Sequence, residues 1–244
     1  MTIAAFVKHG EAVFSDGPIQ KLLVATKRFN AKDLTPNLRT VGFHYNHSSS
    51  GINLGLARNP VLTKLESMDE SVYRGLDGER PNEKLASAMA ELAKARPTFK
   101  VWVRSGTEIA SDAAVLPFFE EANPATLHTL ALTNCIAVTD ATAEAIAGSP
   151  KAAGLRKLHF FNSGIGPAGV DTLLSSAHLG GITDFGFTSY DGYGGEVWSD
   201  GAWNAVGQHF ADLPEARAPK KLELHSSRAF APALAEALKK KYGL

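Results

Sequence analysis

The chain has 244 residues, of which 44% are hydrophobic and 20% are charged, and its 25 Lys and Arg residues balance its 25 Asp and Glu residues. This composition predicts an ordinary globular protein with one substantial core, and it excludes extended disorder as the dominant state. A net charge of zero gives no electrostatic reason to expect nucleic acid or an anionic membrane as a partner, because both are bound by concentrated basic surfaces.

The N-terminal segment, residues 1–37, does not fit the pattern found downstream and is predicted to be a capping region. Ile19, Leu22 and Val24 make a degenerate strand possible within it. The segment lacks the basic and long apolar stretches of a secretory signal, and no later run is long enough to span a membrane. The single cysteine, Cys135, fits a reducing compartment. We therefore expect a cytoplasmic protein.

One sequence pattern recurs downstream of residue 37. The segment LRKLHFFNS, which begins at Leu155, has apolar residues at its first, fourth and sixth places and a small polar residue at its ninth. The same frame begins at Leu38 (LRTVGFHYN), Leu127 (LHTLALTNC) and Pro219 (PKKLELHSS), and at Ile182 (ITDFGFTSY), where Tyr190 departs from it at the ninth place. Weaker copies begin near positions 62 and 98. The starts at 127, 155 and 182 lie 28 and 27 residues apart, a spacing typical of repeat proteins.

A second apolar pattern with helical spacing follows each frame, as in TDATAEAIAG and APALAEALKK. The combination resembles the leucine-rich repeat family, and its long spacing is most similar to the ribonuclease-inhibitor-like class. The resemblance covers residues 38–244, with insertions near 70–97 and 190–197. It implies an α/β solenoid with parallel strands on the concave face and helices on the convex face, in which stacking buries what one unit cannot bury alone.

The glycines Gly164, Gly166 and Gly169 form a G-x-G-x-x-G motif between a strand-like and a helix-like run. Such a turn could hold a dinucleotide pyrophosphate, with Asp184 or Asp191 as the acid that binds the ribose. However, the place of Gly169 in the frame is taken by Thr142, Gly201 or Leu234 in other units. The pattern therefore favours a repeated structural unit, and a small nucleotide-binding α/β enzyme remains the alternative.

Other candidate chemical groups are isolated. His44 and His47 lack further metal ligands nearby in sequence, so surface histidines are expected there. Cys135 could act as a nucleophile with His128 or His159, but the ninth place of the frame predicts a buried thiol that supports a turn. We therefore expect a non-catalytic protein without metal or cofactor.

The outward-facing strand positions are the remaining candidates for function. Aromatic and arginine side chains dominate the energetic centres of protein interfaces. The candidate partner-binding residues are His44, Trp102, Arg104, His159, Phe161, Tyr190, Tyr193, Trp198 and His225. A register one residue different would turn Trp102 inward. Trp198 could instead pack against the following helix, as we expect Trp203 to do.

The sequence thus predicts a scaffold that recognises an unidentified protein through its concave sheet face and the loop at residues 190–197. A bacterial effector or a toxin-neutralising protein fits this description, although no sequence marker selects either. Inhibition of a ribonuclease is not expected, because the face is neither strongly acidic nor rich in tryptophan, as a surface for a basic enzyme should be. Self-association through the sheet edges or end units is a third possibility.

Overall fold

The computed structural model describes residues 21–24, 39–43, 57–58, 62–70, 83–105, 110–189 and 198–244. The strands among them are β1 (Lys21–Val24), β2 (Thr40–Phe43), β3 (Ser67–Glu70), β4 (Val101–Ser105), β5 (Thr129–Thr133), β6 (Lys157–Phe161), β7 (Asp184–Ser189) and β8 (Lys221–Ser226). They form one eight-stranded sheet in chain order. Every neighbouring pair is parallel. This order is compatible with a solenoid-like α/β fold.

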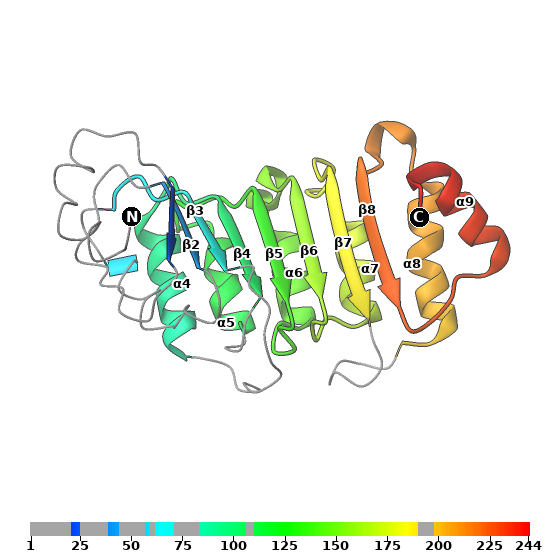
Figure 1. Ribbon diagram of the computed structural model, residues 1–244, viewed down its shortest axis with the longest axis horizontal. Coiled ribbons are helices and arrows are strands. Elements are labelled where there is room, and N and C mark those ends of the chain that lie inside the picture. The colour runs from blue at the N-terminus through cyan, green and yellow to red at the C-terminus, as the bar shows by residue number, and fades with distance from the viewer. Residues whose placement is uncertain are drawn as a thin grey trace.

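The helices among the described residues are α4 (Glu83–Ala95), α5 (Asp112–Val115), α6 (Asp140–Gly148), α7 (Pro167–Ser175), α8 (Asp200–Asp212) and α9 (Pro232–Tyr242). Short 3-10 segments lie at Leu116–Phe118, Pro150–Gly154 and Glu215–Arg217. The helices α4 to α7 lie behind the sheet, and α8 and α9 lie at its C-terminal end (Figure 1). No helix in the described part of the chain has the length and hydrophobicity needed to cross a membrane.

Alternate strand residues build the core between the sheet and the helices. In β5 and β6, Leu130 pairs with Leu158 and Leu132 with Phe160, and all four side chains are completely buried. The two rows continue through Phe185 and Leu222 and through Phe187 and Leu224. These are the inward positions that the repeated frame predicts from starts at 127, 155, 182 and 219. One continuous core cluster runs from Val41 to Leu238.

The predicted orientation of β4 was wrong by one residue. Trp102 pairs with Leu130 and Arg104 with Leu132, so both residues occupy inward rows, at 0% and 2% exposure. The sequence Val-Trp-Val-Arg offers apolar side chains at both alternating positions, and the larger Trp102 ring is the one buried. It lies 6.0 Å from the ring of Phe118, measured between centroids. The outward positions of β4 are therefore the two valines.

The same shift affects β3. Met68 pairs with Trp102 and is completely buried, although the predicted frame placed it on the outward face. The segment predicted as an insertion near 70–97 contains α4, which buries Leu85, Met89 and Leu92 in the core. The sheet also begins upstream of residue 38, because β1 pairs with β2 through Leu22 and Val41. Residues 1–20 and 190–197 lie outside the described residues.

Side chains in the first turn of one helix join neighbouring units. The Asp112 carboxylate accepts hydrogen bonds from the backbone N–H of Thr139 (2.8 Å) and from the hydroxyls of Thr139 (2.7 Å) and Thr142 (2.6 Å). Asp140 likewise accepts from the Gly166 N–H, which lies at the start of α7 (2.7 Å). A negative charge is favourable at a helix N-terminus, so these carboxylates stabilise both the next helix and the stacking of the units.

Candidate functional site

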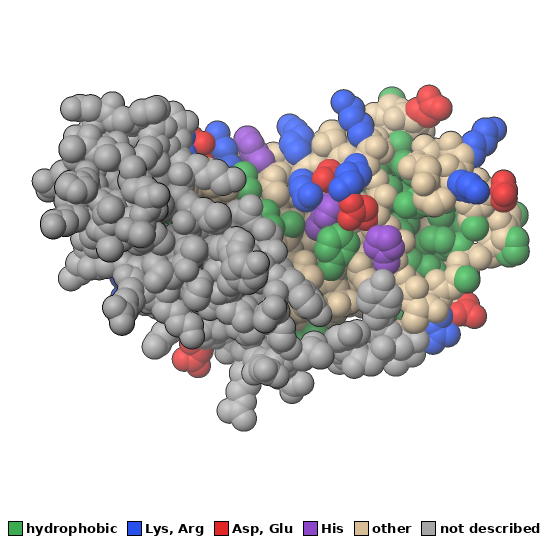
Figure 2. Space-filling view, viewed as in Figure 1, with side chains coloured by type: hydrophobic (Ala, Val, Ile, Leu, Met, Phe, Trp, Pro, Cys, Tyr) green, Lys and Arg blue, Asp and Glu red, His purple; other side chains and the backbone are tan. Residues whose placement is uncertain are grey.

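The outward side of the sheet is the surface that no described helix covers (Figure 1). We call it the open sheet face. Strand alternation and register assign to it Val101, Val103, Thr129, Ala131, Thr133, Lys157, His159, Phe161, Asp184, Gly186, Thr188, Lys221, Glu223 and His225. Charged and histidine side chains gather on the described part of this face (Figure 2). The register places them mainly on β6, β7 and β8.

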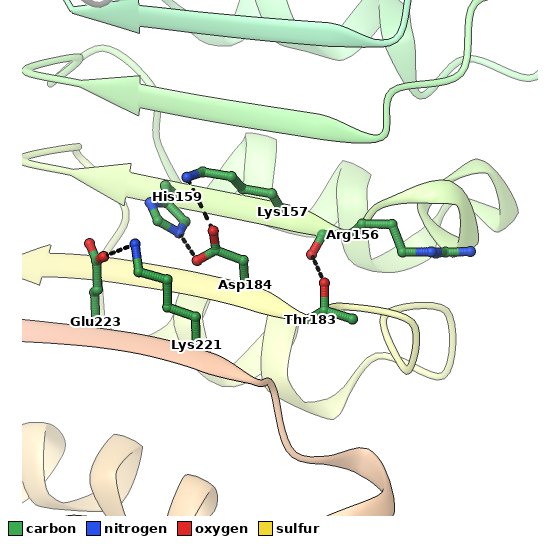
Figure 3. A network of polar contacts seen from close by, with 7 residues as sticks. All are labelled: Arg156, Lys157, His159, Thr183, Asp184, Lys221 and Glu223. Carbon is green, nitrogen blue, oxygen red and sulfur yellow. Dashed lines mark hydrogen bonds and ion pairs between the residues drawn. The ribbon is translucent and has the colours of Figure 1, made fainter. Parts of the chain in front are cut away.

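A polar network links β6 to β7. The register sets Lys157 beside Asp184, and their ammonium and carboxylate groups are 3.1 Å apart. The other oxygen of Asp184 lies 2.5 Å from Nε2 of His159, whose side chain is only 4% exposed. Figure 3 shows the two β6 side chains converging on the carboxylate. Asp184 is thus held by two donors from the same strand.

The protonation states follow from burial and from these contacts. Burial lowers the pKa of His159 and outweighs the opposing effect of its hydrogen bond with Asp184. A carboxylate can only accept, so a neutral His159 carries its hydrogen on Nε2 and donates it. Burial alone would raise the pKa of Asp184, but the hydrogen bonds from His159 and Lys157 prevail and lower it. At neutral pH the network is a neutral imidazole, a carboxylate and an ammonium group.

Gly186 makes room for the two aromatic rings of β6. A Cβ atom at Gly186 would lie 2.8 Å from Cγ of His159 and 2.9 Å from Cζ of Phe161. The two rings meet edge to face, with centroids 5.1 Å apart. The absence of a side chain at this position therefore lets both rings lie over β7.

A second pair of charges lies on β8, where Lys221 contacts Glu223. The hydrogen bond and charge of Lys221 lower the pKa of Glu223, and those of Glu223 raise the pKa of Lys221. His225 follows on the same side of the strand and is exposed. The face over β6 to β8 thus carries balanced, mutually paired charges with aromatic and imidazole rings beside them.

The His159–Asp184 pair is half of an acid–base catalytic arrangement, and the described residues do not complete it. Asp184 is the hydrogen-bond partner that the structure gives the His159 ring, and no Ser, Thr or Cys of the described chain bonds to it. Cys135 is buried, and its thiol donates to the Thr133 carbonyl at 3.4 Å, as its place in the frame predicts. The described residues also contain no cluster of three potential metal ligands.

The glycine motif is packed against the preceding unit. A Cβ atom at Gly164 would lie 2.2 Å from the carbonyl oxygen of Ile136, and one at Gly169 would lie 2.1 Å from Oδ1 of Asp140. The N–H groups of Gly164 and Gly166 already donate, to the Val138 carbonyl and to Asp140. An incoming phosphate would therefore meet a carboxylate where the motif would need free donors.

The structure separates the predicted partner-binding residues into three groups. His159, Phe161 and His225 lie on the open sheet face, although the His159 ring is buried there at 3% exposure, and Trp102 and Arg104 are buried by the register of β4. Trp198 is also buried, so its prediction as a surface residue was wrong. His44, Tyr190 and Tyr193 lie outside the described residues.

Trp198 is buried because of its position beside the start of α8. Ser199 caps this helix by accepting from the N–H of Ala202 at 3.1 Å. Trp198 immediately precedes the cap and packs edge to face on Trp203, with centroids 5.8 Å apart, in the arrangement of a hydrophobic staple. Trp203 also stacks on Phe230 at 5.2 Å, which confirms that it packs inside the molecule.

Asp184 was predicted only as a ribose-binding acid of the nucleotide alternative, and the charges beside it were not predicted as site residues. The spacing of the frame contained a usable signal, because aligning the units at 155, 182 and 219 sets Lys157, Asp184 and Lys221 side by side. No protein-family model matches the chain, and no characterised protein is significantly similar to it in sequence.

Proposed function

We propose that the chain is a leucine-rich-repeat solenoid that recognises another protein, without catalysis, through the open sheet face over β6 to β8. The recurring frame and the parallel strands in chain order support the repeat assignment. Stacked repeats use the side chains of such a continuous face for binding, while the inward rows hold the units together.

The observation that carries the proposal is the network around Asp184, together with the rings of Phe161 and His225 on an uncovered face. Its charges are of both signs and are paired within the protein, so the surface matches a mixed polar and apolar partner better than a uniformly charged polymer. The pairing also holds the side chains in place before binding, which reduces the entropy lost when a partner docks.

Affinity capture tests this proposal. The variant carrying Phe161→Ala and His225→Ala is expected to retain about a tenth or less of the partner captured by the wild type, because aromatic groups at the centre of an interface carry much of its binding energy. A matched control carries Glu236→Ala and Lys240→Ala, two exposed positions on α9. Equal capture by wild type and both variants, all folded by circular dichroism, would remove the face from consideration.

A further inference from the structure

A row of basic side chains lies where the strands begin. The residue immediately before β4 is Lys100, the one before β5 is His128 and the one before β6 is Arg156. We call these three residues the basic rim. The backbone fixes them side by side, since the N–H of His128 donates to the Lys100 carbonyl (2.7 Å) and that of Arg156 to the His128 carbonyl (2.9 Å). Lys and Arg side chains gather along this edge of the sheet (Figure 2).

The neighbouring place in this row, before β3, holds Glu66, whose carbonyl accepts from the N–H of Lys100 and whose carboxylate is bound by Arg39. None of its three residues forms an ion pair with a described carboxylate, in contrast to Lys157 and Lys221 on the adjoining face. Burial lowers the pKa of His128, and the positive charges of Lys100 and Arg156 lower it further. These two cations are the charged groups that act on the imidazole. The row is therefore a site of mutual repulsion that a negative ligand would relieve.

Arg156 is already positioned for an anion. Its Nη1 donates to the carbonyls of Ala153 and Leu155, at 2.8 Å each, which holds the guanidinium at the end of the 3-10 segment. Its Nε and Nη2 have no partner among the described residues. A guanidinium fixed in this way loses little freedom when its remaining donors bind a carboxylate.

The position of the basic rim selects a protein ligand. Neighbouring strands lie about 4.8 Å apart, so Lys100 and Arg156 are separated by about 9.6 Å, close to the length of three residues of an extended peptide. Nucleic acid needs a wider basic footprint than three residues in a row. An acidic segment of a partner seated on the open sheet face would reach the rim.

We infer that the basic rim binds carboxylates of an acidic segment in the partner that occupies the open sheet face. This inference rests on the proposed function. It also predicts that protonation of His128 adds a third cation, so that binding of the acidic segment tightens as the pH falls below about 6.5, the ordinary histidine pKa, while aspartate is still ionised.

The test uses a fluorescently labelled oligo-aspartate peptide and anisotropy titrations of the full chain at low ionic strength. The rim variant carries Lys100→Gln and Arg156→Gln. Its matched control, Lys239→Gln with Lys240→Gln, removes the same net charge from exposed positions on α9. We expect the rim variant to bind about tenfold more weakly than the wild type and the control to bind within about twofold of it. His128→Gln should abolish the tightening at lower pH.

Equal affinities of the rim variant and its control would overturn the inference, and so would tighter binding of an oligothymidylate than of the peptide. Partner capture separates this failure from failure of the proposed function. If Phe161→Ala with His225→Ala abolishes capture while the rim variant captures at full yield, the face is the binding surface and the rim is not. Reduced capture by both variants supports the two together.

Discussion

At the scale of single residues, His159 and Asp184 make folding stability depend on pH. The pKa of His159 is lower in the folded protein than its ordinary value near 6.5, so the unfolded chain takes up the proton first as the pH falls. The stabilisation is therefore complete above about pH 6.5 and is lost below it. Folding also lowers the pKa of Asp184, so the protein loses further stability as the pH falls below 3.8, the ordinary pKa of this group.

We predict that the free energy of unfolding falls between about pH 7 and pH 5 and that His159→Gln reduces this slope. Glutamine can still donate to Asp184 but does not titrate. Urea denaturation at several pH values measures the slope. Part of it should persist in the variant, since His128 and His209 also have lowered pKa values. An unchanged slope would mean that His159 is not buried as a neutral group.

Gly164 provides a second residue-scale prediction. Gly164→Ala should cost about 1–3 kcal/mol of stability, because its Cβ would lie 2.2 Å from the backbone carbonyl of Ile136, which cannot move aside freely. Gly148 is the control, since a Cβ there meets nothing within 4 Å at the end of α6. Gly148→Ala should be neutral or stabilise by about 0.5 kcal/mol. Thermal denaturation compares the two variants, and equal stabilities would show that the glycine turn is not packed against the preceding unit.

At the scale of elements, Asp112 is expected to stabilise the junction of α5 and α6. Asp112→Ala removes three hydrogen bonds to Thr139 and Thr142 and should cost about 2–3 kcal/mol. Asp171→Ala, at an exposed position of α7, should change stability by less than about 0.5 kcal/mol. Denaturant unfolding gives both values. A comparable, small effect of the two substitutions would show that the carboxylate does not join the units.

The strands that the sequence predicted well are those with a single apolar alternation. In β5 to β8, every second residue is aliphatic or aromatic, and the residues between them are mostly polar or small. The inward rows could therefore be assigned in advance. In β4 the alternation was ambiguous, because Val101 and Val103 compete with Trp102, and an arginine occupies the next inward place. Packing against Phe118 decides the register there, and the local sequence does not contain that information.

The candidate site was predictable only in part for a related reason. His159, Phe161 and His225 followed from strand alternation alone. The role of Asp184 depends on the register between strands and on burial, which together determine which donors reach its carboxylate. Trp198 was misassigned because a glycine-rich aromatic segment is typical of an exposed loop, whereas the helix cap at Ser199 turns this ring into the core.

At the scale of the whole molecule, the core encloses all three tryptophans of the sequence. Trp102, Trp198 and Trp203 are exposed by 0%, 2% and 1%. We predict a blue-shifted fluorescence emission that acrylamide quenches weakly in the native protein and strongly in urea. Trp102→Ala should destabilise the fold by about 3–5 kcal/mol, as removal of a large core ring does. Strong quenching of the native protein would place at least one of these rings at the surface and contradict their burial in the core.

The molecule has a side covered by helices and a side where the sheet is open. We propose that the partner protein binds to the open sheet face. Lysine acetylation of the captured complex, read by mass spectrometry, tests this directly, because Lys221 lies on that face while Lys239 and Lys240 are exposed on α9. We predict that the partner protects Lys221 from acetylation and leaves the two α9 lysines reactive. Protection of Lys239 and Lys240 with Lys221 still reactive would contradict the claim.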